Sequence, residues 1–180
     1  MPTVISADAA LPSPVATGEG PGVRADPAGK AIRFVYEVTN PVADAKATTA
    51  HYARIFSLDA SRFCPIESHG FGYDGTLTLF NPPDRLDRIE VTRTNGGGAM
   101  DRFYHRRGAS LYMCYIEVDD VPALAARLEA NECRYALSDE KDPDVGLFIH
   151  PSALFGMLMG VSRTNYAWTW SGRPHLAGKR

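Results

Sequence analysis

The sequence has 180 residues, of which 44% are hydrophobic and 22% are charged, and its formal net charge is −2. These values are typical of one compact globular domain, or of two small modules that share a core. Such a small net charge argues against nucleic acid and anionic membranes as partners, and no apolar run approaches the length of a transmembrane helix.

Residues 1–30 are rich in Ala, Pro and Gly and contain few large apolar side chains. Such a segment buries too little surface to offset the entropy of ordering it, so a flexible N-terminal arm is predicted. It has no basic stretch followed by an apolar core, so it is not expected to be a secretion signal. The cysteines at 64, 114 and 133 show no CxxC spacing, which favours reduced thiols in a cytoplasmic protein.

Residues 31–39 alternate as a strand with one face in the core. The apolar face, expected to lie under a helix, consists of Ile32, Phe34, Tyr36 and Val38. The opposite face consists of Arg33, Val35 and Glu37. A helix is predicted over 41–57, because Asn40 can cap its free N–H groups and proline follows in the first turn. Strands are then predicted at about 61–68, 76–80 and 87–94.

The same order recurs in the second half of the chain. A short turn is predicted at 99–107, followed by a strand at 109–118 that ends in Glu-Val, as the first strand does. An Asp pair and a proline then begin a helix over 120–130, which stops at Asn131 and is expected to bury Val121, Leu124, Ala125 and Leu128. Strands are predicted at 132–137, 145–149 and 156–162.

This duplication predicts two βαβββ modules. The first covers 31–95 and the second 109–163, with a glycine-rich linker at 96–108 and an aromatic tail at 164–180. The tail carries Tyr166, Trp168 and Trp170. It is expected to pack over the body or against a second subunit, and a place at the mouth of a ligand site is the alternative.

The order of elements, with a Glu-Val-Asp-Asp-Val junction at 117–121, resembles the vicinal-oxygen-chelate superfamily. That superfamily includes glyoxalase I, methylmalonyl-CoA epimerase, extradiol dioxygenases and the bleomycin-resistance proteins. Further similarities are Arg106-Arg-Gly before the fifth strand and the segments 148–151 and 156–161. The likeness covers about 31–163. It implies an α+β fold in which two βαβββ modules form a curled mixed sheet around a central cavity.

The superfamily typically takes four metal ligands from the first and last strand of each module. Carried over to this sequence, those positions are Arg33, Glu90, Met113 and Gly160. Only Glu90 is an ordinary ligand for Zn²⁺, Fe²⁺ or Mn²⁺, because arginine stays protonated and a thioether is soft. The resemblance therefore implies the fold, while these residues predict no metal at the usual place and no other cofactor.

If the first-strand ligand position points inward, strand parity places five candidate catalytic groups in the cavity. They are Glu90, Glu37, Arg33, Tyr115 and Glu117. Carboxyl groups held close together in a half-dry cavity do not all ionise, so one gains a pKa suited to acid–base catalysis. Arginine and phenol groups would stabilise a developing oxyanion. The alternative is that Arg33–Glu90 and Arg88–Glu37 are ion pairs that only neutralise the interior.

Candidate substrate-binding residues are Arg88, Met113, Val35, Leu111, His105 and His69. The leading hypothesis is a metal-independent enzyme, an isomerase, epimerase or lyase or one that forms or opens a ring. It would move a proton on a small, partly aromatic or polycyclic metabolite. A homodimer is a further expectation, because the superfamily often pairs subunits.

Two other hypotheses remain open. One is a non-catalytic protein that sequesters a small molecule, as the bleomycin-resistance proteins do. The other is a metalloenzyme of dioxygenase or glyoxalase type with displaced ligands, drawn from Glu90, His69, His105 and His150.

Overall fold

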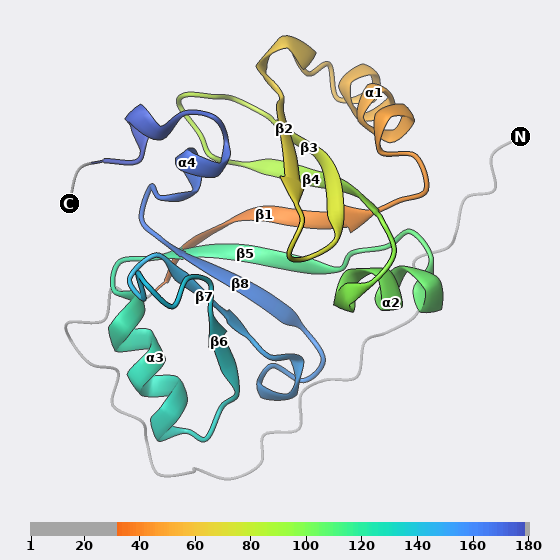
Figure 1. Ribbon diagram of the computed structural model, residues 1–180. Helices are drawn as coiled ribbons and strands as arrows, with labels where there is room; N and C mark the ends of the chain where they lie inside the picture. Colours follow the sequence, from red (N-terminus) through yellow and green to blue (C-terminus); the bar gives the residue numbers. More distant parts are fainter. Residues whose placement is uncertain (1–31, 179–180) are drawn as a thin grey trace, which may run out of the picture.

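The computed structural model describes residues 32–178 (Figure 1), so the predicted arm over 1–30 lies outside the described residues. The first half contains β1 (Ile32–Pro41), α1 (Ala45–Ile55), β2 (Cys64–Ser68), β3 (Tyr73–Leu79), β4 (Arg88–Thr94) and α2 (Gly98–Arg107). The second half contains β5 (Met113–Val118), α3 (Val121–Ala130), β6 (Tyr135–Leu137), β7 (Gly146–Ile149), β8 (Leu158–Arg163) and α4 (Ala167–Trp170).

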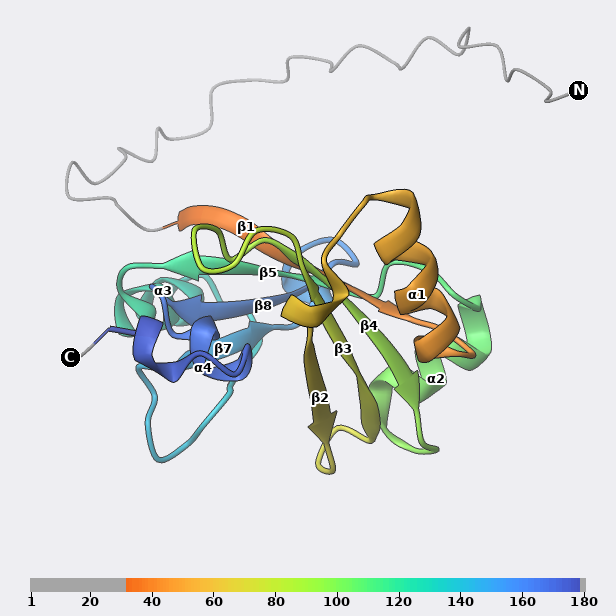
Figure 2. The same cartoon turned by 90° about the horizontal axis from the view of Figure 1, so that it is seen from above.

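The described strands form one mixed sheet of eight, in the order β2-β3-β4-β1-β5-β8-β7-β6. β1 runs parallel to β4 and β5 runs parallel to β8, while the antiparallel β1–β5 pair joins the two halves. Figure 2 shows β2, β3 and β4 on one side of this central pair and β7 and β8 on the other. Each half therefore has the predicted order of strand, helix and three strands, and the boundaries of the modules stay a prediction.

The two long helices that follow β1 and β5 begin differently. α3 starts as predicted, because the Asp120 side chain accepts a hydrogen bond of 2.8 Å from the Ala123 N–H. The predicted cap at Asn40 is wrong: Asp44 caps α1 by accepting from the Ala47 N–H at 2.9 Å. β1 continues past Asn40 because its pairing with β4 extends through Pro41, so the helix can begin only later.

The segment predicted as a short turn at 99–107 is the helix α2. Gly97 and Gly98 have φ values of 111° and 83°, which non-glycine residues rarely adopt, and they turn the chain into the helix. Met100 is then buried, and the Phe103 ring packs edge-on against the Tyr112 ring at 5.0 Å. The sequence predicts a linker at this glycine run, whereas in the structure the glycines with positive φ lie at the start of a helix.

The hydrophobic core lies in separate clusters on the two faces of the sheet. The predicted inner face of α3 is confirmed: Val121 and Leu128 are buried against β5, β7 and β8, with Leu124 and Ala125 packed beside them. On the other side, β1, β3, α4 and the loop before β4 contribute Tyr36, Leu77, Leu79, Leu86, Ala167 and Trp168. The tail is therefore part of the core, and burial of a large apolar side chain contributes about 1.5–3 kcal/mol.

The alternation predicted for β1 is interrupted. Two register shifts occur in its pairing with β5, between Ile32 and Val35 and between Val35 and Glu37. Such irregularities place neighbouring side chains on one side of a strand. Tyr36 therefore packs in the cluster with β3 and α4 rather than under α1, and Ile32 is 63% exposed.

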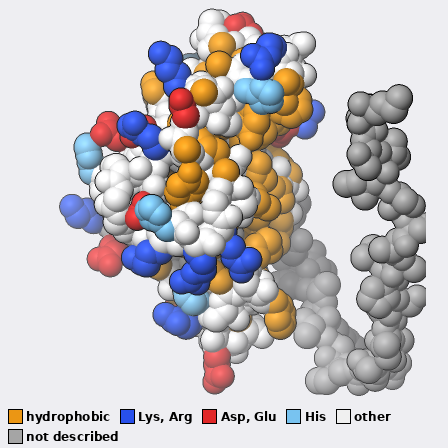
Figure 3. All heavy atoms as spheres, turned by 90° about the vertical axis from the view of Figure 1, so that its right-hand side faces the viewer, with side chains coloured by type: hydrophobic (Ala, Val, Ile, Leu, Met, Phe, Trp, Pro, Cys, Tyr) orange, Lys and Arg blue, Asp and Glu red, His pale blue; other side chains and the backbone are white. Residues whose placement is uncertain are grey.

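On the face that carries α1 and α2, hydrophobic side chains gather in a band beside basic ones (Figure 3). Large apolar side chains with high exposure in the described part of the chain include Ile55, Phe56, Leu111 and Phe155. Pairing of subunits stays a prediction. No helix within residues 32–178 is long and apolar enough to cross a membrane.

Candidate active site

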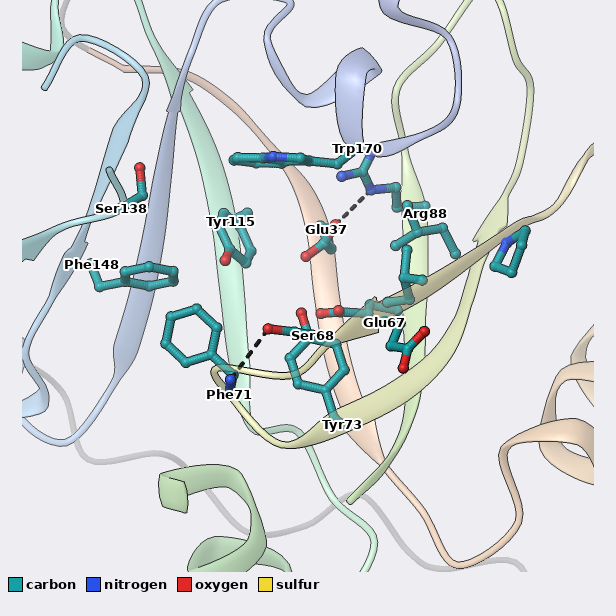
Figure 4. A pocket seen from close by; sticks show the side chains of 14 residues that line it. Glu37, Glu67, Ser68, Phe71, Tyr73, Arg88, Tyr115, Ser138, Phe148 and Trp170 are labelled. Atoms are coloured by element: carbon teal, nitrogen blue, oxygen red, sulfur yellow. Dashed lines mark hydrogen bonds and ion pairs between the residues drawn. The ribbon is translucent and has the colours of Figure 1, made fainter. Parts of the chain in front are cut away.

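A cavity of about 440 Å³ lies between the two halves of the sheet and the C-terminal tail (Figure 4). Its polar lining side chains are Glu37, Glu67, Ser68, Tyr73, Arg88, Glu90, Tyr115 and Ser138. Phe71, Phe148 and Trp170 supply aromatic walls. Figure 4 shows Trp170 above Tyr115 at one end and Tyr73 at the other, with Glu37 between Tyr115 and Arg88.

The parallel pairing of β1 with β4 brings two acidic side chains together. Its register sets Glu37 opposite Arg88 and Thr39 opposite Glu90. The Arg88 Nε donates a hydrogen bond of 2.6 Å to Glu37 Oε2, and both side chains are buried. The Thr39 hydroxyl donates a hydrogen bond of 2.5 Å to Glu90 Oε2. The ion pair Arg88–Glu37, one alternative from the sequence, is therefore present.

The Arg88 guanidinium has further partners in the tail. Its Nη1 donates to the Ala167 carbonyl at 3.3 Å and to the Ser171 hydroxyl. Its Cζ also lies 5.0 Å from the centre of the Tyr36 ring, a cation–π distance. This cation is therefore engaged by protein groups on several sides.

Burial, and then the negative charge of Glu37, raise the pKa of Glu90 to about 8. The Thr39 hydrogen bond and the Arg88 charge act in the opposite direction but are smaller effects. At neutral pH Glu90 therefore mostly holds its proton, beside the ion pair. A carboxyl group with a pKa near neutrality, at the wall of a cavity, is suited to donating and accepting protons.

Two phenol groups lie close to these carboxyl groups. Burial and the charges of Glu37 and Glu90 raise the pKa of Tyr115 and of Tyr73 well above the usual value. Both phenols therefore stay protonated and can donate hydrogen bonds into the cavity.

The aromatic wall joins segments far apart in the sequence. The Phe71 ring lies 5.6 Å from the Phe148 ring, and the Tyr115 ring lies 5.9 Å from Phe148 and 6.0 Å from Trp170, all in edge-to-face contact. Such contacts add to the burial energy of each ring. Together the rings offer flat apolar surfaces beside the carboxyl pair.

Tyr115 occupies the space that a side chain at position 160 would need. Gly160 is opposite Tyr115 in the β5–β8 register, and a Cβ atom there would overlap the phenol ring. Gly160 is the position carried over for the superfamily's last-strand ligand. The glycine therefore makes room for the phenol at the wall of the cavity.

Gly160→Ala is expected to force the Tyr115 ring aside and to lower the free energy of unfolding by about 1–3 kcal/mol, as overpacking does. Urea unfolding and near-ultraviolet circular dichroism of the aromatic side chains measure both effects. Gly70→Ala is the matched control, because nothing lies within 4 Å of a Cβ atom there. Equal stability of the two variants would contradict this contact.

Three of the predicted cavity residues lie elsewhere. Strand parity predicted that Arg33 points into the cavity, but its side chain is 47% exposed and pairs with Asp119 at 3.2 Å. The prediction failed because the irregular pairing of β1 with β5 shifts the alternation of side chains. The Arg33–Glu90 ion pair, which the sequence left open as an alternative, is therefore not formed. Val35 and Leu111 are 56% and 63% exposed and do not line this cavity.

Glu117 is buried but does not line the cavity either. Its Oε1 accepts a hydrogen bond of 2.7 Å from the Asn165 N–H, so it holds the turn between β8 and α4. Burial raises the pKa of this carboxyl group. Met113 lines a second cavity beside the first.

The histidines considered from the sequence are spread over the surface. His69 lies 3.3 Å from Glu67, and His105 lies 3.5 Å from Asp101 within α2. His150 accepts from the Ser152 N–H at 3.1 Å and caps a short turn. None of these three lines the cavity.

The side chains at the carried-over corners do not fit a chelated metal ion. Glu90 accepts a hydrogen bond from Thr39, the Tyr115 ring covers position 160, and Arg33 lies outside the cavity. Across residues 32–178, no three side chains of His, Cys, Asp or Glu are grouped so that they could hold a metal. The donor set therefore disagrees with the metal chemistry that the superfamily implies.

Sequence reasoning missed Thr39, Tyr73 and the aromatic wall. β3 was predicted to begin at 76, which left Tyr73 in a loop, although it pairs with Ser68 across the β2–β3 hairpin. Thr39 could not be identified from the sequence, because its role comes from the hydrogen bond to Glu90 on the neighbouring strand β4. Trp170 lies at the cavity, as one alternative for the tail had it.

Neither a protein-family model nor a curated protein matches the sequence. Solved structures do match the fold. Methylmalonyl-CoA epimerase from Mycobacterium tuberculosis is 18% identical, with a TM-score of 0.64 over 76% of this chain and 91% of that chain. A variant of the Streptomyces coelicolor epimerase in complex with 2-nitronate-propionyl-CoA is 14% identical, with a TM-score of 0.63 over 73% and 94%. The order of the strands, the paired halves and these matches together show that the chain has the vicinal-oxygen-chelate fold.

Proposed function

We propose that the protein is an isomerase-type enzyme that moves a proton on a small, partly aromatic or polycyclic metabolite. The observation that carries the proposal is the buried carboxyl pair, in which Glu90 keeps a proton near neutral pH beside Glu37 at the wall of a cavity. We also propose that the mixed sheet curls around that cavity. It uses no metal, because the residues at the corners do not fit one.

The carboxyl pair, carrying one proton, supplies both a base and an acid. The ionised carboxylate removes a proton from the carbon next to a substrate carbonyl, and the electron pair of that C–H bond moves onto the carbonyl oxygen. Tyr73 and Tyr115 donate hydrogen bonds to the oxyanion, the role first given to Arg33. Return of a proton to carbon, from the same or the opposite face, completes an isomerisation or epimerisation.

The similarity in fold supports the reaction class, since the matched structures include an epimerase in complex with methylmalonyl-CoA. That substrate is a property of the matched protein. Lyase chemistry and ring formation or opening use the same first proton removal, and they stay within the proposal.

Glu90→Gln is expected to lower the rate of proton transfer by about 10²–10⁴-fold, because an amide cannot exchange a proton at neutral pH. The measurement is deuterium uptake from D₂O, followed by NMR, into a panel of ring ketones and acyl-CoA thioesters. Glu37→Gln is run in parallel, with Glu140→Gln, an exposed position outside both cavities, as the control. Full activity of both the Glu90 and the Glu37 variants would remove the acid–base proposal.

The second candidate is a protein that sequesters a small molecule. The aromatic wall favours it, because flat rings bind ligands without any chemistry. It predicts that a bound compound is recovered unchanged after long incubation, with no deuterium at carbon.

A further inference from the structure

A second cavity of about 290 Å³ adjoins the first. Five side chains line both of them: Phe71, Tyr73, Glu90, Tyr115 and Phe148. We call the first cavity, with Glu37 and Arg88, the polar chamber, and the second, with Met100, Met113 and Leu158, the apolar chamber. Glu90 therefore lies at the junction of the two.

The apolar chamber is lined by α2 and by the starts of β5 and β8. Met100 and Met113 are buried there, and Ala136, Leu158 and the Phe148 ring complete its walls. Methionine side chains adapt to the outline of an apolar ligand. Glu90 is the one carboxyl group among the described residues that line this chamber, and it is protonated at neutral pH.

Charge in the two chambers disfavours an anionic ligand. Among the described lining residues Arg88 is the one cation, and its charge is already paired with the buried Glu37 carboxylate, while its Nη1 donates to the tail. Glu37 and Glu67 add negative charge. An anionic ligand would lose its hydration without gaining a free cation in return.

The geometry points to an uncharged ring ketone as the substrate class, one that spans both chambers. Its hydrocarbon ring lies in the apolar chamber, and the carbon that exchanges its proton lies at the junction beside Glu90. The carbonyl oxygen faces the phenols of Tyr73 and Tyr115. This inference rests on the proposed function, and it separates the protein from enzymes whose acyl-CoA substrates carry a carboxylate.

The test uses 2-tetralone, a neutral bicyclic ketone, and its carboxylated analogue 6-carboxy-2-tetralone. Isothermal titration calorimetry with the full chain is expected to give a Kd for the neutral ketone at least about tenfold lower than for the anion. Equal or tighter binding of the anion, or no binding of 2-tetralone at all, would overturn the inference.

Leu158→Trp should fill the apolar chamber and weaken 2-tetralone binding by about tenfold or more. Leu111→Trp is the matched control, because Leu111 is 63% exposed and lines neither chamber. Circular dichroism checks folding, and Ala99→Phe replaces Leu158→Trp if that variant does not fold. Unchanged binding in a folded chamber variant would overturn the placement of the ring.

Deuterium uptake into 2-tetralone separates this inference from the proposed function. If the chamber variants weaken binding but Glu90→Gln leaves exchange at the wild-type rate, the chamber assignment stands and the acid–base role fails. If Glu90→Gln stops exchange while the chamber variants bind normally, the acid–base role stands and the substrate placement fails.

Discussion

Replacing Glu90 by Gln is expected to stabilise the protein at pH 8, even though it removes the proposed catalytic group. Burial and the charge of Glu37 raise the folded-state pKa of Glu90 to about 8, whereas the unfolded chain titrates near the usual value for glutamate. Between these two pKa values the folded protein holds a proton that the unfolded chain has lost. Stability therefore falls by about 1.4 kcal/mol per pH unit as the pH rises through that window.

Gln is uncharged, has nearly the same shape, and can accept from Thr39 and donate to Glu37. The variant should match wild type at about pH 5 and exceed it by on the order of 4 kcal/mol at about pH 8. Urea unfolding over this range measures the difference. A wild-type stability that does not fall with pH, or a variant less stable at every pH, would contradict the raised pKa.

Arg88→Met is expected to lower the free energy of unfolding by about 3–5 kcal/mol, because it leaves Glu37 buried without its cation. The buried contacts with Ala167 and Ser171 are lost as well. Urea unfolding at neutral pH provides the measurement, and proteolysis of the tail reports whether it detaches.

Arg93→Met is the matched control on the same strand. Arg93 pairs with Asp74 at 2.8 Å, but its side chain is 59% exposed, so little change in stability is expected. The double variant Arg88→Met with Glu37→Gln should recover part of the loss, since no buried charge is then left alone. Equal effects of Arg88→Met and Arg93→Met would show that the buried pair has no special role.

The second half of the fold could be predicted closely from the sequence. The Asp120 cap and the apolar spacing from Val121 to Leu128 are local signals, and both are confirmed. The first half was less regular. Asn40 and Pro41 resemble a helix start, yet their backbone pairs with β4, and no local signal shows that partner.

The carboxyl pair could be expected from strand parity, but its surroundings could not. Strand parity predicted correctly that Glu37 and Glu90 line the cavity. It failed for Arg33, because the irregular pairing of β1 with β5 lies between Arg33 and Glu37. Tyr73 comes from a hairpin and Trp170 from the tail. Their positions depend on tertiary packing, so the hydrophobic periodicity of the sequence does not predict them.

Arg88 also ties the last segment of the chain to the interior. It is synthesised about halfway along, yet the Ala167 carbonyl and the Ser171 hydroxyl that receive its hydrogen bonds come near the C-terminus. During translation, Arg88 and Glu37 therefore stay exposed to water until the tail has left the ribosome. Burial of the Arg88–Glu37 pair is thus completed only after the last segment of the chain has been synthesised.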